Sequence, residues 1–567
     1  MINFKQKIAE LLSNSIDEIS SDEINDAIEI PPEKEMGDYA FPCFKLAPIL
    51  KQSPVQIAEK LAKSLQKQSQ YIKEIKNEGP YLNFYININI LTKTVLEEIK
   101  NKGNKFGASD MGKNKNIVID FSSPNVAKPF HVGHLRSTVI GNALYNIYSF
   151  LGYNCTGINH LGDWGTQFGK LIYAYKNWGK EKLINEDPIN HLFDLYVKFH
   201  KKAEENPELE DKGRKWFKKL EEGNKEAHKI WKNFVDLSME EFKKIYQQLN
   251  IEFDYYTGES FYNDKMEQIV EKIREKNLLK NSEGAKIVDL EEYDMPPCMI
   301  QKKDGATTYA TRDLAAAFYR KEKFNFDKAL YVTDYSQKLH FSQWIKVIEL
   351  MGFDWAKNIE HIPFGRVSSK DGSLKTRKGN VILLKDLINK TVKKVKEIIS
   401  EKNPDLENKN IVSKKIAVGA IIYNDLSRSK IKDIVFDWDS MLDFEGESGP
   451  YVQYTFTRIN SVLEKSEFNI ETINDYSLLS QEETIAIIKL LYEFPDIIKN
   501  AKDNNEPSIL TRHMTELAKA FNKFYHEYPI LIDNENLQKA RLLLCYAVKE
   551  VLSISLDLLG IEKLKEM

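Results

Sequence analysis

An apolar run, a loop of small and basic residues and a helix-like segment follow one another between residues 117 and 152. The run IVIDF at 117–121 is continuous rather than alternating, which is typical of a strand buried on both faces of a parallel sheet. The later segment LRSTVIGNALYNIYSFLG predicts a helix that ends at Gly152. A strand, a loop and a helix in this order offer a helix N-terminus to an anionic group such as phosphate.

A second unit of this kind lies much later in the chain. KALYVTD at 328–334 predicts a strand, and FSQWIKVIELMG at 341–352 predicts the helix that follows it. The interval from 165 to 300 consists mostly of charged, helix-like segments. We therefore predict an α/β fold in which a split Rossmann-type nucleotide-binding domain carries a helical insertion.

The two ends of the chain predict further domains. The start predicts an α+β domain, because helical patterns precede the alternating strand YLNFYINI, whereas the end is helical throughout. Apolar residues recur there at helical spacing at Met514, Leu517, Phe521 and Phe524. The predicted boundaries are 1–88 for the N-terminal α+β domain, 89–116 for a linker, 117–164 for the first half of the catalytic sheet, 165–300 for the inserted helical region, 301–390 for the second half, 391–449 for connecting helices and 450–567 for the C-terminal all-helical domain.

Composition leaves the partner open. The chain has 567 residues, which predicts several domains, and its net charge of −3 gives no hint of nucleic acid. The four cysteines are widely spaced and form no Cys-x-x-Cys pair, which argues against structural zinc and favours a reducing intracellular compartment. We see no targeting segment and no apolar stretch near the roughly 20 residues of a membrane span. We expect a cytoplasmic monomer with no membrane partner and no tightly bound metal.

The loop SSPNVAKPFHVGH at 122–134 contains the first candidate for chemistry. At the entry to a helix, the imidazoles of His131 and His134 and the backbone of Gly133 can all address an ATP phosphate. Lys128 adds a positive charge three residues upstream. Taken by itself the pattern His-x-Gly-His is weak, because nearby histidines are more often structural.

A second basic segment, SSKDGSLKTRKGN at 368–380, follows the second strand–helix unit. Asp371-Gly372 predicts a hairpin turn, and Lys375, Arg377 and Lys378 follow it. An isolated cluster of this kind is more simply a solvated hairpin tip. Paired with the upstream histidines, it suggests a loop that holds pyrophosphate.

Four longer strings narrow the interpretation: SSPNVAKPFHVGHLRSTVIGNAL, NHLGDWGTQFG, GATTYATRDLAAA and SGPYVQYTFTRINSVL. Together they resemble the arginyl-tRNA synthetases, a family of class I aminoacyl-tRNA synthetases. The resemblance implies an arginine–tRNA ligase that uses ATP with Mg²⁺ to form arginyl-adenylate and pyrophosphate. The arginyl group then passes to the 3′-terminal ribose of tRNA(Arg). It also implies that the N-terminal domain and the connecting helices contact tRNA and that the C-terminal helices bind the anticodon.

The resemblance also implies roles for individual residues. Arginine would contact Ser123, Pro124, Asn125, His134, Tyr309, Asp313 and Gln337. ATP would contact Lys128, His131, Gly133, His134 and Lys375, with His131, His134, Lys128, Lys375 and Lys378 as the catalytic group. Tyr451, Tyr454 and Phe456 would stack on tRNA bases, although core packing is the commoner role of such rings.

Two of these assignments carry open alternatives. Tyr309 and Asp313 are four residues apart, so a helix would place both on one face, but without the resemblance Asp313 is better explained as a helix N-cap. The usual second class I motif, Lys-Met-Ser-Lys-Ser, is replaced here by LKTRKGN. Lys128, Lys375 and Lys378 therefore compete for the role of the pyrophosphate-binding lysine.

The inserted region raises the question of an editing activity. A site that hydrogen-bonds a guanidinium can reject other amino acids by about 10⁴ or more, so editing is not expected. We interpret 165–300 as scaffold and acceptor-stem support, with Glu259 as an additional candidate for the substrate pocket. The alternative functions are a small nucleotidyltransferase, which would lack the terminal helical domain, and a non-enzymatic tRNA-binding relative, which would lose the motif residues.

Overall fold

The computed structural model describes all of the chain except residues 17, 181–185, 370–371, 374–382, 467–468 and 470–475. The described chain forms two compact units. The first comprises Met1–Phe106, Arg458–Pro495 and Glu516–Ser553, and the second comprises Gly107–Thr457, Asp496–Thr515 and Ile554–Met567. The predicted active-site residues all belong to the second unit.

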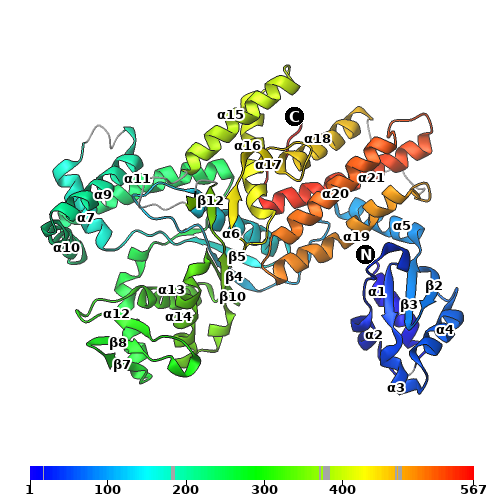
Figure 1. Cartoon of the computed structure of the whole chain (residues 1–567), viewed down its shortest axis with the longest axis horizontal. Helices are drawn as coiled ribbons and strands as arrows, with labels where there is room; N and C mark the ends of the chain where they lie inside the picture. Colours follow the sequence, from blue (N-terminus) through cyan, green and yellow to red (C-terminus); the bar gives the residue numbers. More distant parts are fainter. Residues whose placement is uncertain (17, 181–185, 370–371, 374–382, 467–468, 470–475) are drawn as a thin grey trace. The chain divides into compact units, whose positions relative to one another are not determined.

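A five-stranded parallel sheet forms the centre of the second unit (Figure 1). The strands are β4 (Asn116–Asp120), β5 (Asn154–Asn159), β6 (Tyr255–Tyr256), β10 (Lys328–Asp334) and β11 (Ile359–Phe364). Their spatial order is β11-β10-β4-β5-β6, and every neighbouring pair is parallel. This is the doubly wound order of a Rossmann-type sheet, with its switch point between β4 and β10, as the two apolar runs predicted.

Three helices pack on this sheet. Helix α6 (Val132–Phe150) contacts β4, β5 and β10, while α13 (Tyr309–Phe324) and α14 (Lys338–Leu350) contact β4 and β11 respectively. The close approach of α6 requires Gly141, because a Cβ there would lie 2.2 Å from the Cβ of Phe121. Buried apolar residues of α13 and α14, including Leu314 and Trp344, form a continuous core with the strands.

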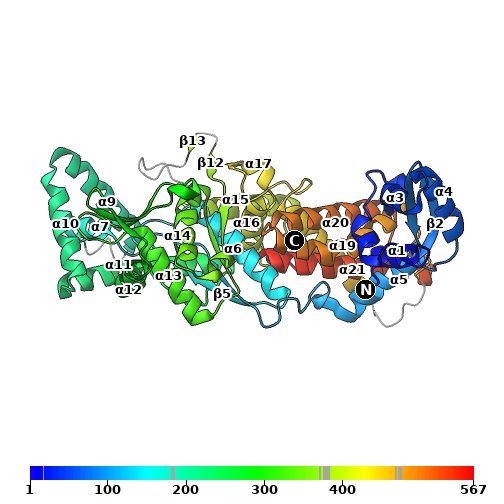
Figure 2. The same ribbon diagram turned by 90° about the horizontal axis from the view of Figure 1, so that it is seen from below.

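The inserted region is helical at first and then changes character. Helices α7 (Thr166–Trp178), α9 (Pro188–Glu205), α10 (Glu208–Glu221) and α11 (Lys225–Leu249) gather in one group (Figure 2). After them the chain returns to the main sheet at β6, and η4 (Glu259–Lys265) and α12 (Met266–Glu275) follow. Strands β7 (Leu279–Ser282), β8 (Ala285–Val288) and β9 (Cys298–Gln301) then form a separate antiparallel sheet.

The inserted region is therefore mostly helical up to α12, whereas the strands β6, β7, β8 and β9 were not predicted. The strands concerned are short, and β7 is almost entirely exposed, so it has no apolar alternation to signal a strand. A short 3-10 helix, η5 (Glu291–Tyr293), connects β8 to β9, and a second one, η7 (Asp354–Asn358), lies later in the chain between α14 and β11.

The basic segment begins with a described hairpin. Strand β12 (Val367–Ser369) pairs antiparallel with β13 (Gly372–Ser373) and parallel with β14 (Ile434–Phe436). The register Ser369↔Gly372 agrees with the predicted turn, although Asp371 itself lies outside the described residues. Helices α15 (Leu384–Lys402), α16 (Lys409–Leu426) and α17 (Trp438–Met441) occupy the predicted connecting region.

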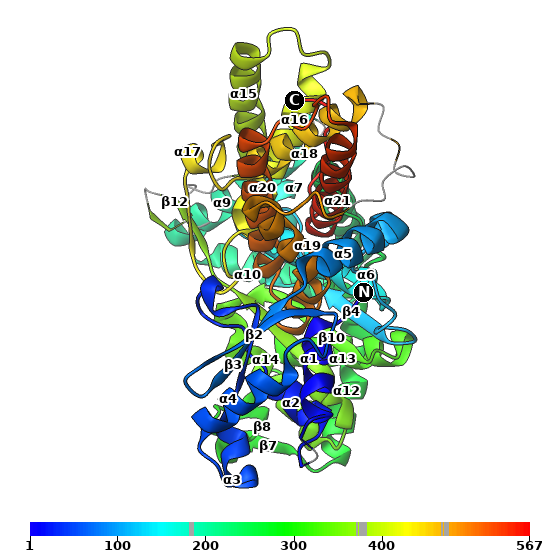
Figure 3. The same cartoon turned by 90° about the vertical axis from the view of Figure 1, so that its right-hand side faces the viewer.

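The N-terminal module has its own sheet and core (Figure 3). The antiparallel strands run in the order β1-β3-β2, from β1 (Tyr39–Pro42), β2 (Ile72–Glu78) and β3 (Tyr81–Ile86). The helical elements are α1 (Phe4–Ser13), α2 (Ser21–Ala27), η1 (Lys34–Met36), η2 (Cys43–Leu46), α3 (Ala47–Leu50) and α4 (Pro54–Leu65). The predicted alternating segment YLNFYINI contains β3, and its residues Leu82, Phe84 and Ile86 are buried.

The predicted linker 89–116 is in large part a helix. Helix α5 (Ile88–Lys102) begins at an Asn87 cap and is followed by η3 (Gly103–Lys105). Its buried residues, including Leu91, Val95 and Ile99, have helical spacing. The prediction of a linker was based on the Lys- and Gly-rich end of the segment and did not take this spacing into account.

The C-terminal region is helical, as predicted, with α18 (Gly449–Lys465), α19 (Glu482–Asp503), α20 (Ser508–Glu527) and α21 (Glu535–Leu559). The predicted apolar stripe on α20 is fully buried at Met514, Leu517, Phe521 and Phe524. Among the described residues, no helix combines the length and apolar character needed to cross a membrane.

Candidate active site

A cavity of about 580 Å³ opens at the carboxyl ends of β4, β10 and β11. This is the switch point of the sheet, where doubly wound folds bind their ligands. Six of the predicted site residues line it, together with their neighbours in the β4–α6 segment and residues that follow β10 and β11. The lining includes Ser122, Ser123, Asn125, His131, Gly133, His134, Arg136, Thr333, Asp334, Tyr335, Gln337, Gly365, Arg366 and Ser368.

The loop between β4 and α6 has a strained backbone. Ser122, Ser123 and Ala127 have φ angles of 76°, 47° and 60°, a region that residues other than glycine seldom adopt. Such strain persists only where surrounding contacts hold the backbone, and it is concentrated at functional sites.

Helix α11 of the insertion supplies two of those contacts. The Ala127 N–H donates to the Ser238 hydroxyl at 2.9 Å, and the Ser122 hydroxyl lies 2.7 Å from the Tyr246 hydroxyl. The Tyr246 hydroxyl also accepts from the Asn159 side chain at 2.8 Å. The insertion therefore holds the loop that carries the histidines, through Ser238 and Tyr246, which sequence reasoning did not identify.

His131 is the N-cap of α6 and is paired with His134. The Gly133 N–H donates to His131 Nδ1 at 3.0 Å, and the His131 N–H faces His134 Nδ1 at 3.3 Å. The two rings stack with their centroids 3.8 Å apart. Since both Nδ1 atoms act as acceptors, each neutral imidazole carries its proton on Nε2 and keeps that N–H as a donor.

The charge state of the histidines follows from their surroundings. Burial, reinforced by the positive charge of Lys128, lowers the pKa of His131 to about 4. Burial also lowers the pKa of His134 well below its usual value, with His131 and Lys128 adding to the effect. Both rings are therefore neutral near pH 7 and can donate hydrogen bonds to phosphate oxygens.

The cations of the site lie in different places. The ammonium of Lys128 lies 5.3 Å from the ring centroid of Tyr196, and Lys128 is not part of the cavity lining. Lys375 and Lys378 fall outside the described residues. Arg366, which the sequence did not nominate, lines the cavity, with its Nε 3.4 Å from Asp334.

Arg136 connects α6 to the base of the basic segment. It is fully buried and donates to the carbonyls of Gly365 at 3.0 Å and Lys432 at 2.6 Å. Its Nε lies 3.4 Å from Asp425, and burial raises the pKa of that carboxyl to about 6 although Arg136 opposes the rise.

The predicted arginine-binding residues of α13 do not share the first cavity. Tyr309 is the first residue of α13 and is 63% exposed, and Asp313 lies one turn further on. Thr308 is the N-cap of this helix, so the alternative role of Asp313 as a cap is wrong. Instead, Asp313 Oδ2 accepts a hydrogen bond from His340 Nε2 at 2.5 Å. His340 lies in the first turn of α14, directly after the turn that contains Gln337.

A group of buried charges surrounds this face of α13. Glu259 Oε2 lies 3.1 Å from Arg312 Nη1, and Asp163 accepts two hydrogen bonds from Ser260. Burial raises the pKa of Glu259 to about 7, Arg312 opposes that rise, and Asp313 and Asp163 add to it. The negative charge of Asp313 therefore acts on Glu259, which was predicted only as an additional candidate for the substrate pocket.

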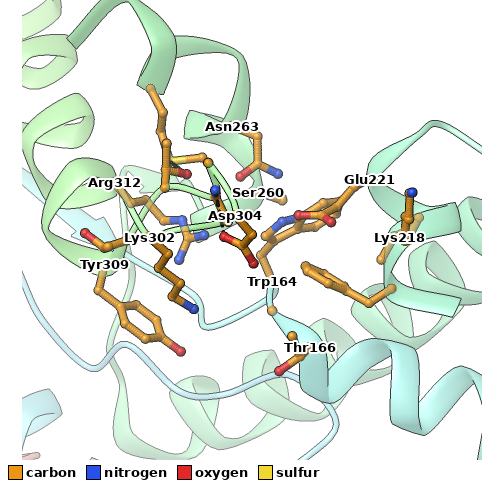
Figure 4. A pocket seen from close by; sticks show the side chains of 18 of the residues that line it. Trp164, Thr166, Lys218, Glu221, Ser260, Asn263, Lys302, Asp304, Tyr309 and Arg312 are labelled. Carbon is orange, nitrogen blue, oxygen red and sulfur yellow. Dashed lines mark hydrogen bonds between the residues drawn. The ribbon is translucent and has the colours of Figure 1, made fainter. Parts of the chain in front are cut away.

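Tyr309 and Arg312 line a second cavity, of about 1130 Å³ (Figure 4). Its walls come from the start of α7, from α10, α11, η4 and α12, and from the turn before α13. Trp164, Lys218, Glu221, Lys302 and Asp304 are among its lining residues.

The predicted tRNA-stacking residues lie on α18. Phe456 is 7% exposed, so its ring is not available to a base in this conformation, whereas Tyr454 is 39% exposed. Tyr451 is half-buried.

No group of three or more His, Cys, Asp or Glu side chains among the described residues has the arrangement needed to hold a metal ion.

The chain combines the sheet order, the switch-point cavity and the paired histidines with a C-terminal helical domain, which is the arrangement of a class I aminoacyl-tRNA synthetase. Residues 95–438 match the family described as tRNA synthetases class I (R), catalytic domain. Residues 3–86 match the arginyl tRNA synthetase N terminal domain, and residues 452–567 match the DALR anticodon binding domain. The chain belongs to the arginyl-tRNA synthetase family.

Full-length relatives agree with this placement. The arginine–tRNA ligase of Alkaliphilus metalliredigens is 56% identical over 567 residues, and that of Clostridioides difficile is 50% identical, with 100% of each chain covered. The crystal structure of the Plasmodium falciparum arginyl-tRNA synthetase aligns with a TM-score of 0.81 and 26% identity, covering 100% of this chain and 99% of that one. The Thermus thermophilus arginyl-tRNA synthetase, at 22% identity and a TM-score of 0.82, shares the fold.

Proposed function

We propose that this chain activates L-arginine with ATP and transfers the arginyl group to the 3′-terminal ribose of tRNA(Arg). The observation that carries the proposal is the pair of neutral histidines at the N-terminus of α6, on the wall of the switch-point cavity. Two Nε2–H donors and a helix N-terminus suit the phosphates of ATP, which would enter as its Mg²⁺ complex.

The first step joins the arginine carboxylate to the α-phosphorus of ATP and releases pyrophosphate. It needs the two groups placed in line and the growing charge on the phosphate stabilised, rather than a protein nucleophile. His131 and His134 donate to that charge, and Arg366, Lys128 and the lysines of the basic segment are the candidate cations for pyrophosphate.

The second step transfers the arginyl group from the adenylate to a ribose hydroxyl of the tRNA end. Ser123, Asn125 and Gln337 line the cavity and suit the backbone groups of the amino acid. The strained loop fixes the first two of these residues, so the amino acid is held in one orientation for both steps.

Recognition of the arginine side chain is assigned to the α13 face. Glu259 and Asp313 supply carboxylates and Tyr309 supplies an aromatic ring, which together suit a planar guanidinium. Lysine and ornithine would leave part of this buried polar set unpaired, and sites of this kind discriminate by about 10⁴ or more without editing.

The proposal is tested by ATP–pyrophosphate exchange with tRNA present. Exchange is expected with arginine and is expected to be negligible with equal concentrations of lysine or ornithine. Exchange that depends on another amino acid, or on none, would refute the assignment.

The role of Asp313 is tested by Asp313→Asn. The substitution keeps the shape and the contact with His340 but removes the charge opposite the guanidinium. Because Asp313 is partly exposed, we expect the KM for arginine to rise by about 10²-fold, less than for a fully buried pair, with the KM for ATP unchanged. An unchanged arginine KM would exclude Asp313 from the substrate site.

A further inference from the structure

Arg312 places one of the protein's own guanidinium groups against two of the proposed arginine-binding residues. Its Nη1 lies 3.1 Å from Glu259 Oε2, and its guanidinium carbon lies 5.6 Å from the ring centroid of Tyr309. The Arg312 side chain is 10% exposed and that of Glu259 is 17% exposed. A carboxylate and an aromatic ring around a guanidinium are the same chemistry that the substrate side chain requires.

This arrangement satisfies Arg312 incompletely. Its Nε is buried and has no hydrogen-bond partner among the described residues, which destabilises this position of the side chain. Free arginine also carries a guanidinium, and its own carboxylate and amine can bind in the neighbouring cavity. It can therefore make the same contacts with Glu259 and Tyr309 at a lower free-energy cost than Arg312 does.

The second cavity gives the Arg312 side chain a place to move. Arg312, Glu221 and Asp304 all line this space of about 1130 Å³, and Figure 4 shows their side chains around it. Burial raises the pKa of Glu221, the positive charge of Arg312 opposes the rise, and Asp304 adds to it. The positive charge of Arg312 therefore already acts on Glu221, which is an alternative carboxylate partner for it.

We propose that Arg312 occupies the guanidinium subsite of Glu259 and Tyr309 in the arginine-free protein and that substrate arginine displaces it toward Glu221. This inference rests on the proposed function, because it assumes that Glu259 and Tyr309 bind substrate. Arg312 thereby acts as an internal competitor that sets the affinity for arginine. The measured Kd equals the intrinsic Kd divided by the fraction of molecules whose subsite is open.

The first test is equilibrium binding of arginine, by calorimetry, to the full chain carrying Arg312→Gln or Arg312→Lys. Arg312, Asp313 and Asp163 are the charged groups that act on Glu259, and removal of Arg312 favours its protonated form. Binding is therefore measured at pH 8.5, and Arg312→Lys retains a charge that keeps Glu259 ionised. We expect the Kd for arginine to fall at least about fivefold in Arg312→Gln and by less in Arg312→Lys.

Arg214→Gln is the matched control. Arg214 lines the same cavity but pairs with Asp211 on its own helix, so its loss should leave the arginine Kd unchanged. If both Arg312 variants fold but bind arginine with an equal or higher Kd, Arg312 is a structural partner of Glu259 and the proposal is overturned.

Glu221→Gln tests the displaced position. It should raise the arginine Kd severalfold in the otherwise unchanged chain and have no effect in the Arg312→Gln background. No effect in the unchanged chain, or equal effects in both backgrounds, would contradict displacement toward Glu221. Absence of arginine binding by the unchanged chain would instead refute the proposed function itself.

Discussion

The ring of His131 caps α6 through Nδ1, which accepts from Gly133, and leaves its Nε2–H as a donor for phosphate. Capping and donation are separate contributions, because the first stabilises the helix and the second acts on the bound nucleotide. Substitutions can therefore distinguish them.

We expect His131→Asn to keep the cap but lose the donor. Asparagine is a favoured N-cap, so the free energy of unfolding should change little, whereas His131→Ala should lose about 1 kcal/mol. In both variants, adenylate formation should slow by about 10²–10³-fold, as for loss of one donor to a developing oxyanion. Pyrophosphate exchange and thermal unfolding, measured on the same variants, separate the two roles of His131. A near-normal rate of exchange in His131→Asn would show that His131 does not contribute to adenylate formation.

The pKa of Glu259, raised to about 7 by burial, predicts a pH dependence of arginine binding. Above pH 7 the carboxylate is charged and attracts the guanidinium, and as the pH falls it becomes neutral. The KM for arginine should therefore rise below pH 7, approaching about tenfold per pH unit. Glu259→Gln should bind weakly at all pH values with this dependence abolished, and a persistent dependence in that variant would assign the titration to another group.

The residues that form the site could be predicted only where they are contiguous in sequence. The segment 122–134 carries its loop, cap and donors within a single string. By contrast, Glu259 and Arg312 are 53 positions apart, and no local pattern joins them. The same holds for Tyr246 and Ser122, whose hydrogen bond depends on how the insertion packs.

At the scale of elements, α11 holds the active-site loop from outside the sheet. Tyr246 is 2% exposed, and its hydroxyl connects Ser122 to Asn159. Strain in the Ser122–Ser123 backbone is tolerated because these contacts oppose its release.

We expect Tyr246→Phe to weaken this support. Two buried polar groups lose their shared partner, so the free energy of unfolding should fall by about 1–3 kcal/mol. The kcat of exchange should also fall, because Ser123 and Asn125 are less well positioned. Tyr255→Phe, at a site 39% exposed, serves as the control, and wild-type kcat in Tyr246→Phe would show that α11 does not position the loop.

Strands with strong patterns were predictable, and weak ones were not. IVIDF and KALYVTD are apolar and long enough to identify β4 and β10. Strand β6 has only two residues, and β7 is exposed, so their pairing is decided by neighbouring strands rather than by their own sequence.

At the scale of the whole molecule, the compact units do not follow the order of the chain. The boundary between them falls inside each of the four long C-terminal helices α18, α19, α20 and α21. Sequence patterns divide a chain at loops, so a boundary within a continuous helix cannot be read from them. Residues 496–515 and 554–567 belong to the same unit as the catalytic sheet.

The basic segment departs from Lys-Met-Ser-Lys-Ser, which predicts that its nucleotide-binding arrangement is poorly populated without tRNA. If tRNA binds that arrangement preferentially, it shifts the population and activation becomes tRNA-dependent. We expect pyrophosphate exchange with arginine and ATP to be nearly absent until tRNA(Arg) is added. Full exchange in nuclease-treated protein would contradict this requirement without affecting the choice of substrate.

The most direct test of the account is charging of tRNA by the purified full-length chain. Labelled arginine, ATP with Mg²⁺ and tRNA are incubated with the protein, and label bound to tRNA is counted. We predict ATP-dependent attachment of arginine to tRNA(Arg), sensitive to mild base as expected of an ester, and none with lysine or ornithine. Absence of arginyl-tRNA, or charging with a different amino acid, would contradict the assignment of this site.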